Sequence, residues 1–290
     1  MSPAAEDVSF DIDGRLVAGL RRRPTGTASG ERDDEVPRLL CLHGWLDNAA
    51  SFVPLMAHLP ELDIVALDLP GHGASDWLEG GYSFAETVYR VRRVLQRLGW
   101  ERCHLAGHSL GGCIAPQLAV AAPDAVASLI LIEASGPLSE EADALPARLR
   151  RSLEERLDLA RFASRTYPDP EAAVATRLRA ARMAPGSARL IVERQIHRRD
   201  GGWQWRFDPR LRVASSTYLT EAQVRAVLAA VTCPTLTVIA TDGFLAGRDD
   251  TEARLGQLRS RTSVTLAGNH HLHMDTPGPV GEAMRRFLGC

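Results

Sequence analysis

The feature that most constrains this 290-residue chain is a Gly-x-Ser-x-Gly motif centred on Ser109. The apolar run His104 to Ala106 predicts a buried strand before the motif, and the small and apolar residues from Leu110 to Ala119 predict a helix after it. A serine between a strand and a helix lies on a tight turn, where Gly107 and Gly111 leave room because they lack a Cβ. An ordinary Gly/Ser loop is the alternative, but the flanking strand and helix favour an exposed, reactive hydroxyl.

The start of the helix places backbone N–H groups where negative charge develops in acyl transfer. The backbone N–H of Leu110 is therefore one predicted donor of an oxyanion hole. A serine nucleophile also needs a base within hydrogen-bond reach, and the base needs a carboxylate that fixes its tautomer. The expected order of these three groups along the chain is serine, acid, histidine.

Strand-like and helical patterns alternate along most of the chain. The runs Asp63 to Leu67 and Ser128 to Ile132 are continuously apolar or nearly so, which is typical of parallel strands buried on both faces. Tyr82 to Leu98 is helical in pattern, and Val8 to Ala18 predicts a hairpin with Asp-Gly at its turn. The alternation predicts an α/β fold with a mostly parallel, doubly wound sheet.

Four motifs spread over most of the chain resemble those of the α/β-hydrolase family. Besides the serine turn they are His43-Gly44-Trp45, Asp68 to Ser75, and Gly268 to Pro277. Within the family the chain most resembles the serine hydrolase-like proteins, through the stretch His43 to Asn48 and the Gly268 to Pro277 segment. The resemblance implies the α/β-hydrolase fold, and it implies that the backbone N–H of Trp45 is the second oxyanion donor.

The strand–helix alternation breaks at Ala134, and from about Pro137 to Ala222 the pattern is helical, without strand runs. By resemblance this is a helical cap, or lid. The expected domains are therefore a core of residues 1–136 and 223–290 and a cap of residues 137–222 over Ser109. Two sets of cap side chains are expected to contact the core or the substrate, namely the stripe Leu153, Leu157 and Ala160 and the alternating aromatic residues Trp203, Trp205 and Phe207.

The resemblance assigns the base to His270, the first histidine of its segment, with His271 and His273 as neighbouring rivals. Two carboxylates compete for the role of the acid. Asp242 follows an apolar strand run and occupies the usual family position, and it is the preferred candidate. Glu133 ends another strand run and matches the position used by some relatives, the haloalkane dehalogenases among them. A carboxylate at the end of an apolar strand is costly to bury unless it is paired.

The expected function is hydrolysis of an ester or related acyl substrate through a Ser-His-acid triad and a covalent acyl-enzyme. One alternative is a carbon–carbon bond hydrolase that uses the same triad on a diketone. Another is a non-catalytic small-molecule-binding protein on the same fold. Epoxide hydrolases and haloalkane dehalogenases are disfavoured, because their nucleophile is an aspartate and this chain has Ser109. The fold alone does not identify the substrate-binding residues.

Composition and residue spacing limit which other partners and cofactors are expected. A net charge of −2 does not indicate a nucleic-acid partner. The glycine-rich turns lack dinucleotide-binding spacing, and the histidines near position 270 lack paired cysteine or carboxylate spacing, so neither a cofactor nor a metal is expected. An odd cysteine count, a polar stretch Met1 to Asp7 and the lack of an 18-residue apolar run predict reduced thiols, no signal peptide and no membrane span. We therefore expect a cytoplasmic protein; its oligomeric state is not predicted.

Overall fold

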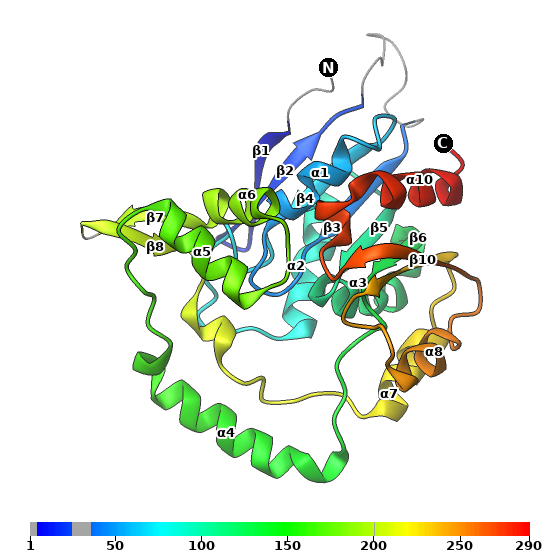
Figure 1. The fold of residues 1–290 in the computed structure, drawn as a ribbon. Helices are drawn as coiled ribbons and strands as arrows, with labels where there is room; N and C mark the ends of the chain where they lie inside the picture. Colours follow the sequence, from blue (N-terminus) through cyan, green and yellow to red (C-terminus); the bar gives the residue numbers. More distant parts are fainter. Residues whose placement is uncertain (1–4, 25–35, 200) are drawn as a thin grey trace.

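A computed structural model describes residues 5–24, 36–199 and 201–290, so part of the stretch considered for a signal peptide lies outside the described residues. Its centre is an eight-stranded sheet of order β1-β2-β4-β3-β5-β6-β9-β10 (Figure 1). The six strands β4, β3, β5, β6, β9 and β10 are parallel to one another, while β1 pairs antiparallel with β2 and β2 pairs antiparallel with β4 at one edge. The predicted mostly parallel sheet is confirmed. The strands are β1 (Glu6–Ile12), β2 (Arg15–Arg22), β3 (Arg38–Leu42), β4 (Asp63–Leu67), β5 (Cys103–His108), β6 (Val126–Ile132), β9 (Thr235–Asp242) and β10 (Arg261–Asn269).

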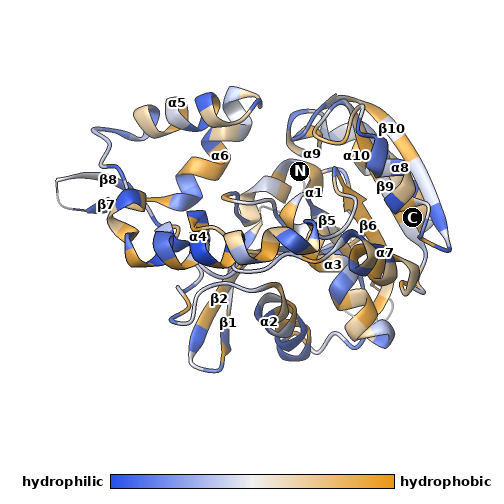
Figure 2. Cartoon of the chain, turned by 90° about the horizontal axis from the view of Figure 1, so that it is seen from below, coloured by the Kyte–Doolittle hydropathy of each residue, from blue (hydrophilic) through white to orange (hydrophobic). Residues whose placement is uncertain are grey.

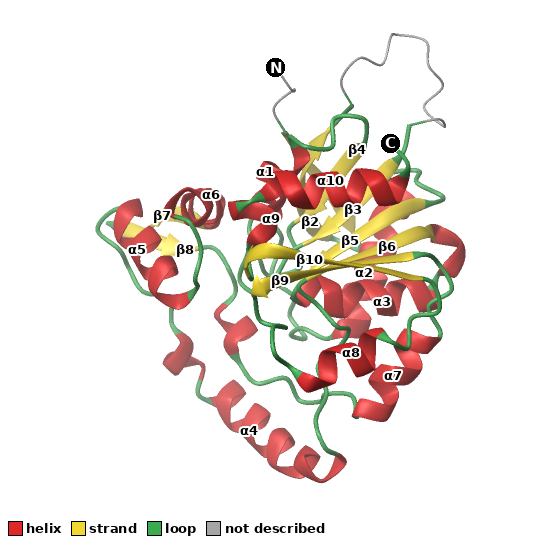
Figure 3. Cartoon of the chain, turned by 45° about the vertical axis from the view of Figure 1, so that its right-hand side comes forward, coloured by secondary structure: helices red, strands yellow, loops and turns green. Residues whose placement is uncertain are grey.

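Helices cover both faces of this sheet (Figure 3). Helices α1 and α10 lie on one face, and α2 and α3 lie on the other, next to α7 and α8. The helices of the sheet layers are α1 (Val53–Met56, preceded by the 3-10 turn Ala49–Phe52), α2 (Phe84–Arg97), α3 (Leu110–Ala121), α7 (Glu221–Ala229), α8 (Asp249–Leu255), α9 (Leu272–Asp275) and α10 (Pro277–Leu288).

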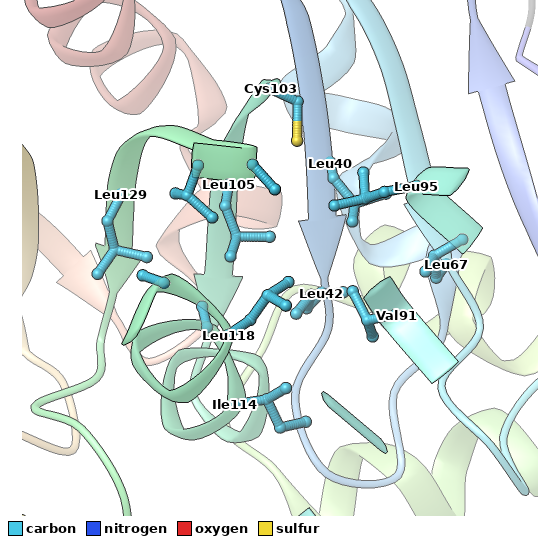
Figure 4. Close-up of a cluster of buried hydrophobic side chains, with 14 of the residues drawn as sticks. Leu40, Leu42, Leu67, Val91, Leu95, Cys103, Leu105, Ile114, Leu118 and Leu129 are labelled. Carbon is cyan, nitrogen blue, oxygen red and sulfur yellow. The ribbon is translucent and has the colours of Figure 1, made fainter. Parts of the chain in front are cut away.

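The central strands are continuously apolar because helices cover both faces of the sheet. In β3, Leu40 and Leu42 point into the cluster shared with α2 and α3, which Figure 4 shows, whereas Leu39 and Cys41 point into the opposite cluster with α1 and α10. Successive side chains of a strand face opposite sides, so a strand covered on both faces needs apolar residues at every position.

Short-range sequence patterns predict the positions of several elements correctly. Strand β4 coincides with the predicted Asp63–Leu67. The predicted hairpin turns at Asp13 and Gly14, which have φ of 54° and 74°, as a two-residue turn of this kind requires. Helix α2 is capped by Ser83, whose Oγ accepts a hydrogen bond from the Glu86 backbone N–H at 3.1 Å.

Residues 137–222, which we call the insertion, lie beside and below the sheet in the view of Figure 1. The expectation of no strand in this region is wrong, because β7 and β8 form an antiparallel hairpin. Each strand has only four residues, so periodicity has too short a window to separate them from the helical pattern around them. The elements are α4 (Leu145–Leu157), α5 (Pro170–Ala180), α6 (Pro185–Gln195), β7 (Ile196–Arg199), β8 (Gly202–Trp205) and the 3-10 turns Ala142–Ala144, Leu159–Phe162 and Pro209–Arg212.

Helix α4 carries hydrophobic and hydrophilic residues intermixed along its length (Figure 2). The stripe that was expected to pack against the core is instead exposed, with Leu153 60% and Leu157 79% accessible. The side of α4 that does make contacts is polar, since Glu155 accepts a hydrogen bond from the Ala214 backbone N–H at 2.7 Å.

Candidate active site

Ser109 lies on the turn between β5 and α3, as its motif predicts. Its backbone has φ 49° and ψ −109°, a conformation that costs on the order of 1–3 kcal/mol for a residue other than glycine. The Ser109 backbone N–H donates to the Ile132 carbonyl oxygen at 3.1 Å, which holds the turn against the end of β6. The side chain is half-buried, and Ser109 Oγ has no hydrogen-bond partner among the described residues.

The glycines around Ser109 are required by contacts between backbone segments. A Cβ on Gly107 would overlap the Gly111 carbonyl, and one on Gly111 would overlap the Leu42 carbonyl oxygen. A Cβ on Gly112 would overlap the Ala134 side chain. Helix α3 therefore packs against the ends of β3 and β6 at distances that only glycine allows.

The two expected oxyanion donors lie on adjacent segments. Leu110 is the first residue of α3, and the next residue, Gly111, donates its backbone N–H to the His43 carbonyl oxygen at 3.0 Å. This bond ties the start of α3 to the loop that contains Trp45. Within residues 5–24, 36–199 and 201–290, the backbone N–H groups of Trp45 and Leu110 have no acceptor. Neither N–H group is therefore committed to another acceptor within the described residues.

His270 follows β10 and lies beside the serine segment. Its carbonyl oxygen accepts a hydrogen bond from His108 Nε2 at 2.8 Å, and the two rings are 4.7 Å apart, so the residue before Ser109 touches His270 directly. The exposed ring of Phe244 lies 5.8 Å from His270 on another side. The His270 side chain remains 26% accessible.

Glu133 is the carboxylate that meets His270. His270 Nδ1 lies 3.2 Å from Glu133 Oε2, and the Glu133 side chain is fully buried. Backbone N–H groups of Ala240 and Phe244 donate to the two carboxylate oxygens at 2.7 and 2.6 Å, and the N–H of Leu245 adds a longer contact of 3.4 Å. These donors satisfy a carboxylate that would otherwise be costly at the end of an apolar strand.

The preference for Asp242 does not match this geometry. Asp242 is exposed at the end of β9, and its carboxylate accepts a hydrogen bond from the neighbouring Thr241 Oγ1 at 3.3 Å. The residue after Asp242 is Gly243. A Cβ at position 243 would overlap the Glu133 carboxylate, so this position has to be glycine. Asp249 and Asp250 begin α8, further along the chain.

The other histidines of the four motifs are buried. His43 accepts the Leu69 backbone N–H at Nε2, at 2.9 Å, and so joins two loops. His108, His271 and His273 are buried with ring separations of 4.1 to 6.3 Å, next to the buried carboxylate of Asp47. Sequence reasoning did not single out Asp47. The signal available was its place two residues after the proposed donor Trp45.

Two buried histidines are kept neutral by their surroundings. Burial, and then His43, lowers the pKa of His72 to about 3, and burial, and then His271, lowers the pKa of His273 to about 3. Because the folded pKa lies below the unfolded value near 6.5, the unfolded chain takes up these protons first. Stability is therefore complete above pH 6.5 and falls as the pH drops toward the folded values.

At pH 5.0 the two histidines together are expected to lower the free energy of unfolding by roughly 4 kcal/mol relative to pH 7.5. Urea unfolding at the two pH values measures this difference. In a His72→Asn variant the difference should shrink by roughly 2 kcal/mol, because asparagine keeps the donor but does not ionise. The exposed His58 provides a control, since His58→Asn should leave the difference unchanged. Equal stability of the wild type at both pH values would contradict the prediction.

The described part of the chain contains no group of three or more His, Cys, Asp or Glu side chains arranged to hold a metal ion. No helix within it is long and apolar enough to cross a membrane. Cys41, Cys103 and Cys113 are buried and free, as their apolar surroundings predict.

Comparison with protein families gives a match over most of the chain. The sequence model described as "alpha/beta hydrolase fold" matches residues 37–277. A "Serine hydrolase-like protein" of Danio rerio is 30% identical over 263 residues, which cover 86% of this chain and 81% of that protein. "Esterase Rv0045c" of Mycobacterium tuberculosis is also 30% identical over 263 residues, covering 87% of this chain and 83% of the esterase.

A solved structure has nearly the same fold throughout. The hypothetical protein PA1622 of Pseudomonas aeruginosa PAO1 superposes with a TM-score of 0.89 at 33% sequence identity, covering 98% of this chain and 100% of that one. The similarity extends over the sheet and the insertion alike.

Proposed function

Because this chain belongs to the α/β-hydrolase fold family, we propose that it cleaves an ester or related acyl substrate with Ser109 as the nucleophile. The observation that carries the proposal is the 3.2 Å contact between His270 Nδ1 and the buried Glu133 carboxylate, next to the strand that ends just before Ser109. A histidine that donates through Nδ1 keeps Nε2 free to accept a proton. The relatives named serine hydrolase-like protein and esterase support the same class of reaction.

In the proposed reaction Ser109 Oγ attacks the acyl carbon while His270 Nε2 takes the hydroxyl proton. The oxygen of the tetrahedral intermediate receives hydrogen bonds from the backbone N–H groups of Leu110 and Trp45. The intermediate then collapses, the leaving group takes the proton from His270, and the acyl group remains on Ser109. A water molecule, deprotonated by His270, attacks the acyl-enzyme and releases the acid.

We assign the acid of the triad to Glu133 and not to Asp242. The Glu133 carboxylate is within hydrogen-bond distance of His270 and is fixed by backbone donors, so it can hold the imidazole in one tautomer and one orientation. Asp242 is exposed and bonded within its own segment.

We also propose that residues 137–222 form a cap over a core of residues 1–136 and 223–290. Trp45 donates its indole N–H to the Leu211 carbonyl oxygen in the insertion at 3.0 Å, which supports a position near the site. Trp205 and Phe207 stack 5.7 Å apart within the insertion. This packing favours an anchoring role for these aromatic side chains over contact with substrate.

The proposal is tested with p-nitrophenyl esters of graded acyl chain length. With an ester whose acyl-enzyme forms faster than it is hydrolysed, an acyl-enzyme mechanism gives a rapid burst of one p-nitrophenol per chain, followed by slower turnover. A binding-only protein gives neither burst nor turnover. A carbon–carbon bond hydrolase cleaves a diketone and not the esters.

A further inference from the structure

The loop that holds the proposed donor Trp45 is bonded to the insertion at four consecutive residues. These contacts come from three different parts of the insertion, so they fix the loop from several directions. They are the hydrogen bond from Trp45 Nε1 to Leu211 O (3.0 Å), that from Gln195 Nε2 to Leu46 O (3.3 Å), the ion pair of Asp47 with Arg177, and the hydrogen bonds from Asn48 Nδ2 to Ile191 O (2.8 Å) and Gln195 Oε1 (3.0 Å).

The same loop contains a strained turn. Leu46 has φ 59°, a left-handed conformation that leucine seldom adopts, and the Asp47 backbone N–H closes the turn on the Gly44 carbonyl oxygen at 3.1 Å. Such a conformation persists only where surrounding contacts over-determine it. Trp45 lies within this turn, so whatever holds the turn also sets the direction of the Trp45 backbone N–H.

The ion pair of Asp47 with Arg177 is the one contact of this set that joins two charged side chains, and it is largely buried. The Asp47 side chain is 1% and the Arg177 side chain 12% accessible. Although burial raises it, the pKa of Asp47 is held well below its usual range by Arg177 and His271. Asp47 Oδ2 also lies 3.5 Å from His271 Nε2 and 3.8 Å from His108 Nδ1.

Asp47 therefore contacts the immediate neighbours of both proposed catalytic side chains, because His108 precedes Ser109 and His271 follows His270. One carboxylate joins the oxyanion loop, the serine segment and the histidine segment, and a single guanidinium from α5 balances its charge. A buried charge that loses its partner either draws in water or moves, and either event disturbs the turn.

We propose that Arg177 and Asp47 are positioning residues, through which the insertion holds the turn at residues 44–47 in the conformation that aligns the Trp45 backbone N–H with the substrate oxygen. This inference rests on the proposed function. It makes the oxyanion hole depend on the insertion, so that the second donor is aligned only while α5 is docked.

The kinetic test compares Arg177→Met with the wild type on a p-nitrophenyl ester. Misalignment of one oxyanion donor acts on the transition state, so kcat should fall about 10- to 100-fold while KM changes less than about threefold. Arg177→Lys keeps a charge for Asp47 and should restore most of the lost kcat. A double Asp47→Asn, Arg177→Met variant should be no slower than Arg177→Met alone, because both changes break the same link.

Arg189→Met is the matched control. Arg189 also lies in the insertion and pairs with a carboxylate, Glu171, but the two side chains are 47% and 62% accessible and do not touch the oxyanion loop. This variant should keep kcat within about twofold, as expected for an exposed ion pair.

Hydrogen exchange tests the inference without turnover. The backbone amide of Asp47, which closes the turn on the Gly44 carbonyl oxygen, should exchange at least about tenfold faster in Arg177→Met than in the wild type, and no faster in Arg189→Met. Arg177→Lys, if Arg177→Met does not fold, should show intermediate exchange. Unchanged exchange of the Asp47 amide, or kcat within twofold of the wild type in Arg177→Met, would overturn the inference. Failure of the proposed function would be seen separately, because a fluorophosphonate would then not label the wild type. In that case the hydrogen-exchange measurement would still decide whether Arg177 holds the turn.

Discussion

Replacing Ser109 with alanine is expected to lower kcat for ester hydrolysis by about 10⁴- to 10⁶-fold and to abolish covalent labelling by a fluorophosphonate. The alanine has no oxygen to attack the acyl carbon, so an acyl-enzyme cannot form. Intact-protein mass spectrometry measures the labelling as one adduct on the wild type and none on the variant. Residual activity should match what the oxyanion donors achieve with water alone.

The control is Ser135→Ala, which removes another serine close to the same sheet edge. Ser135 is buried and lies two residues after Glu133. This variant should take up one fluorophosphonate, as the wild type does. An adduct that persists on Ser109→Ala would contradict the assignment of Ser109 as the nucleophile.

Replacing Glu133 with glutamine is expected to lower kcat by about 10³-fold or more, whereas Asp242→Asn should change kcat by less than about threefold. A carboxylate accepts hydrogen bonds at both oxygens, and Glu133 uses both, toward Ala240 on one and toward Phe244 and His270 on the other. The amide of glutamine has one oxygen, so its NH₂ group must face a donor. The His270 imidazole then loses its fixed tautomer.

Glu133→Gln also leaves buried backbone donors unpaired, so some loss of stability is expected with the loss of activity. Thermal unfolding shows whether the variant is folded at the assay temperature, and activity is compared only below its Tm. A larger loss of kcat in Asp242→Asn than in Glu133→Gln would reverse the assignment.

Local sequence signals were sufficient for the elements around Ser109. The serine turn needs glycine at fixed positions, the strands on either side need apolar residues at every position, and Ser83 caps a helix in a recognisable way. Each of these constraints acts within a few residues or within one strand, so each leaves a mark that a single sequence retains.

The choice between Glu133 and Asp242 could not be made in this way. It depends on whether the backbone of residues 240–245 surrounds the carboxylate of Glu133, which follows β6 more than 100 positions earlier, and on whether Gly243 leaves space for it. The apolar strand before Glu133 showed that the carboxylate needed a partner, but not which one. The pair of Asp47 with Arg177 joins residues 130 positions apart, and nothing local at either residue predicts the other.

The positive φ at Ser109 implies a conflict between activity and folding stability. Glycine reaches φ 49° without the steric penalty that a serine side chain incurs, so the most relaxed residue at this position is one that has no hydroxyl to offer. A hydrolase of this design gives up part of its folding free energy for its nucleophile. Selection for stability alone would therefore favour glycine at position 109, whereas the proposed role as nucleophile requires the serine.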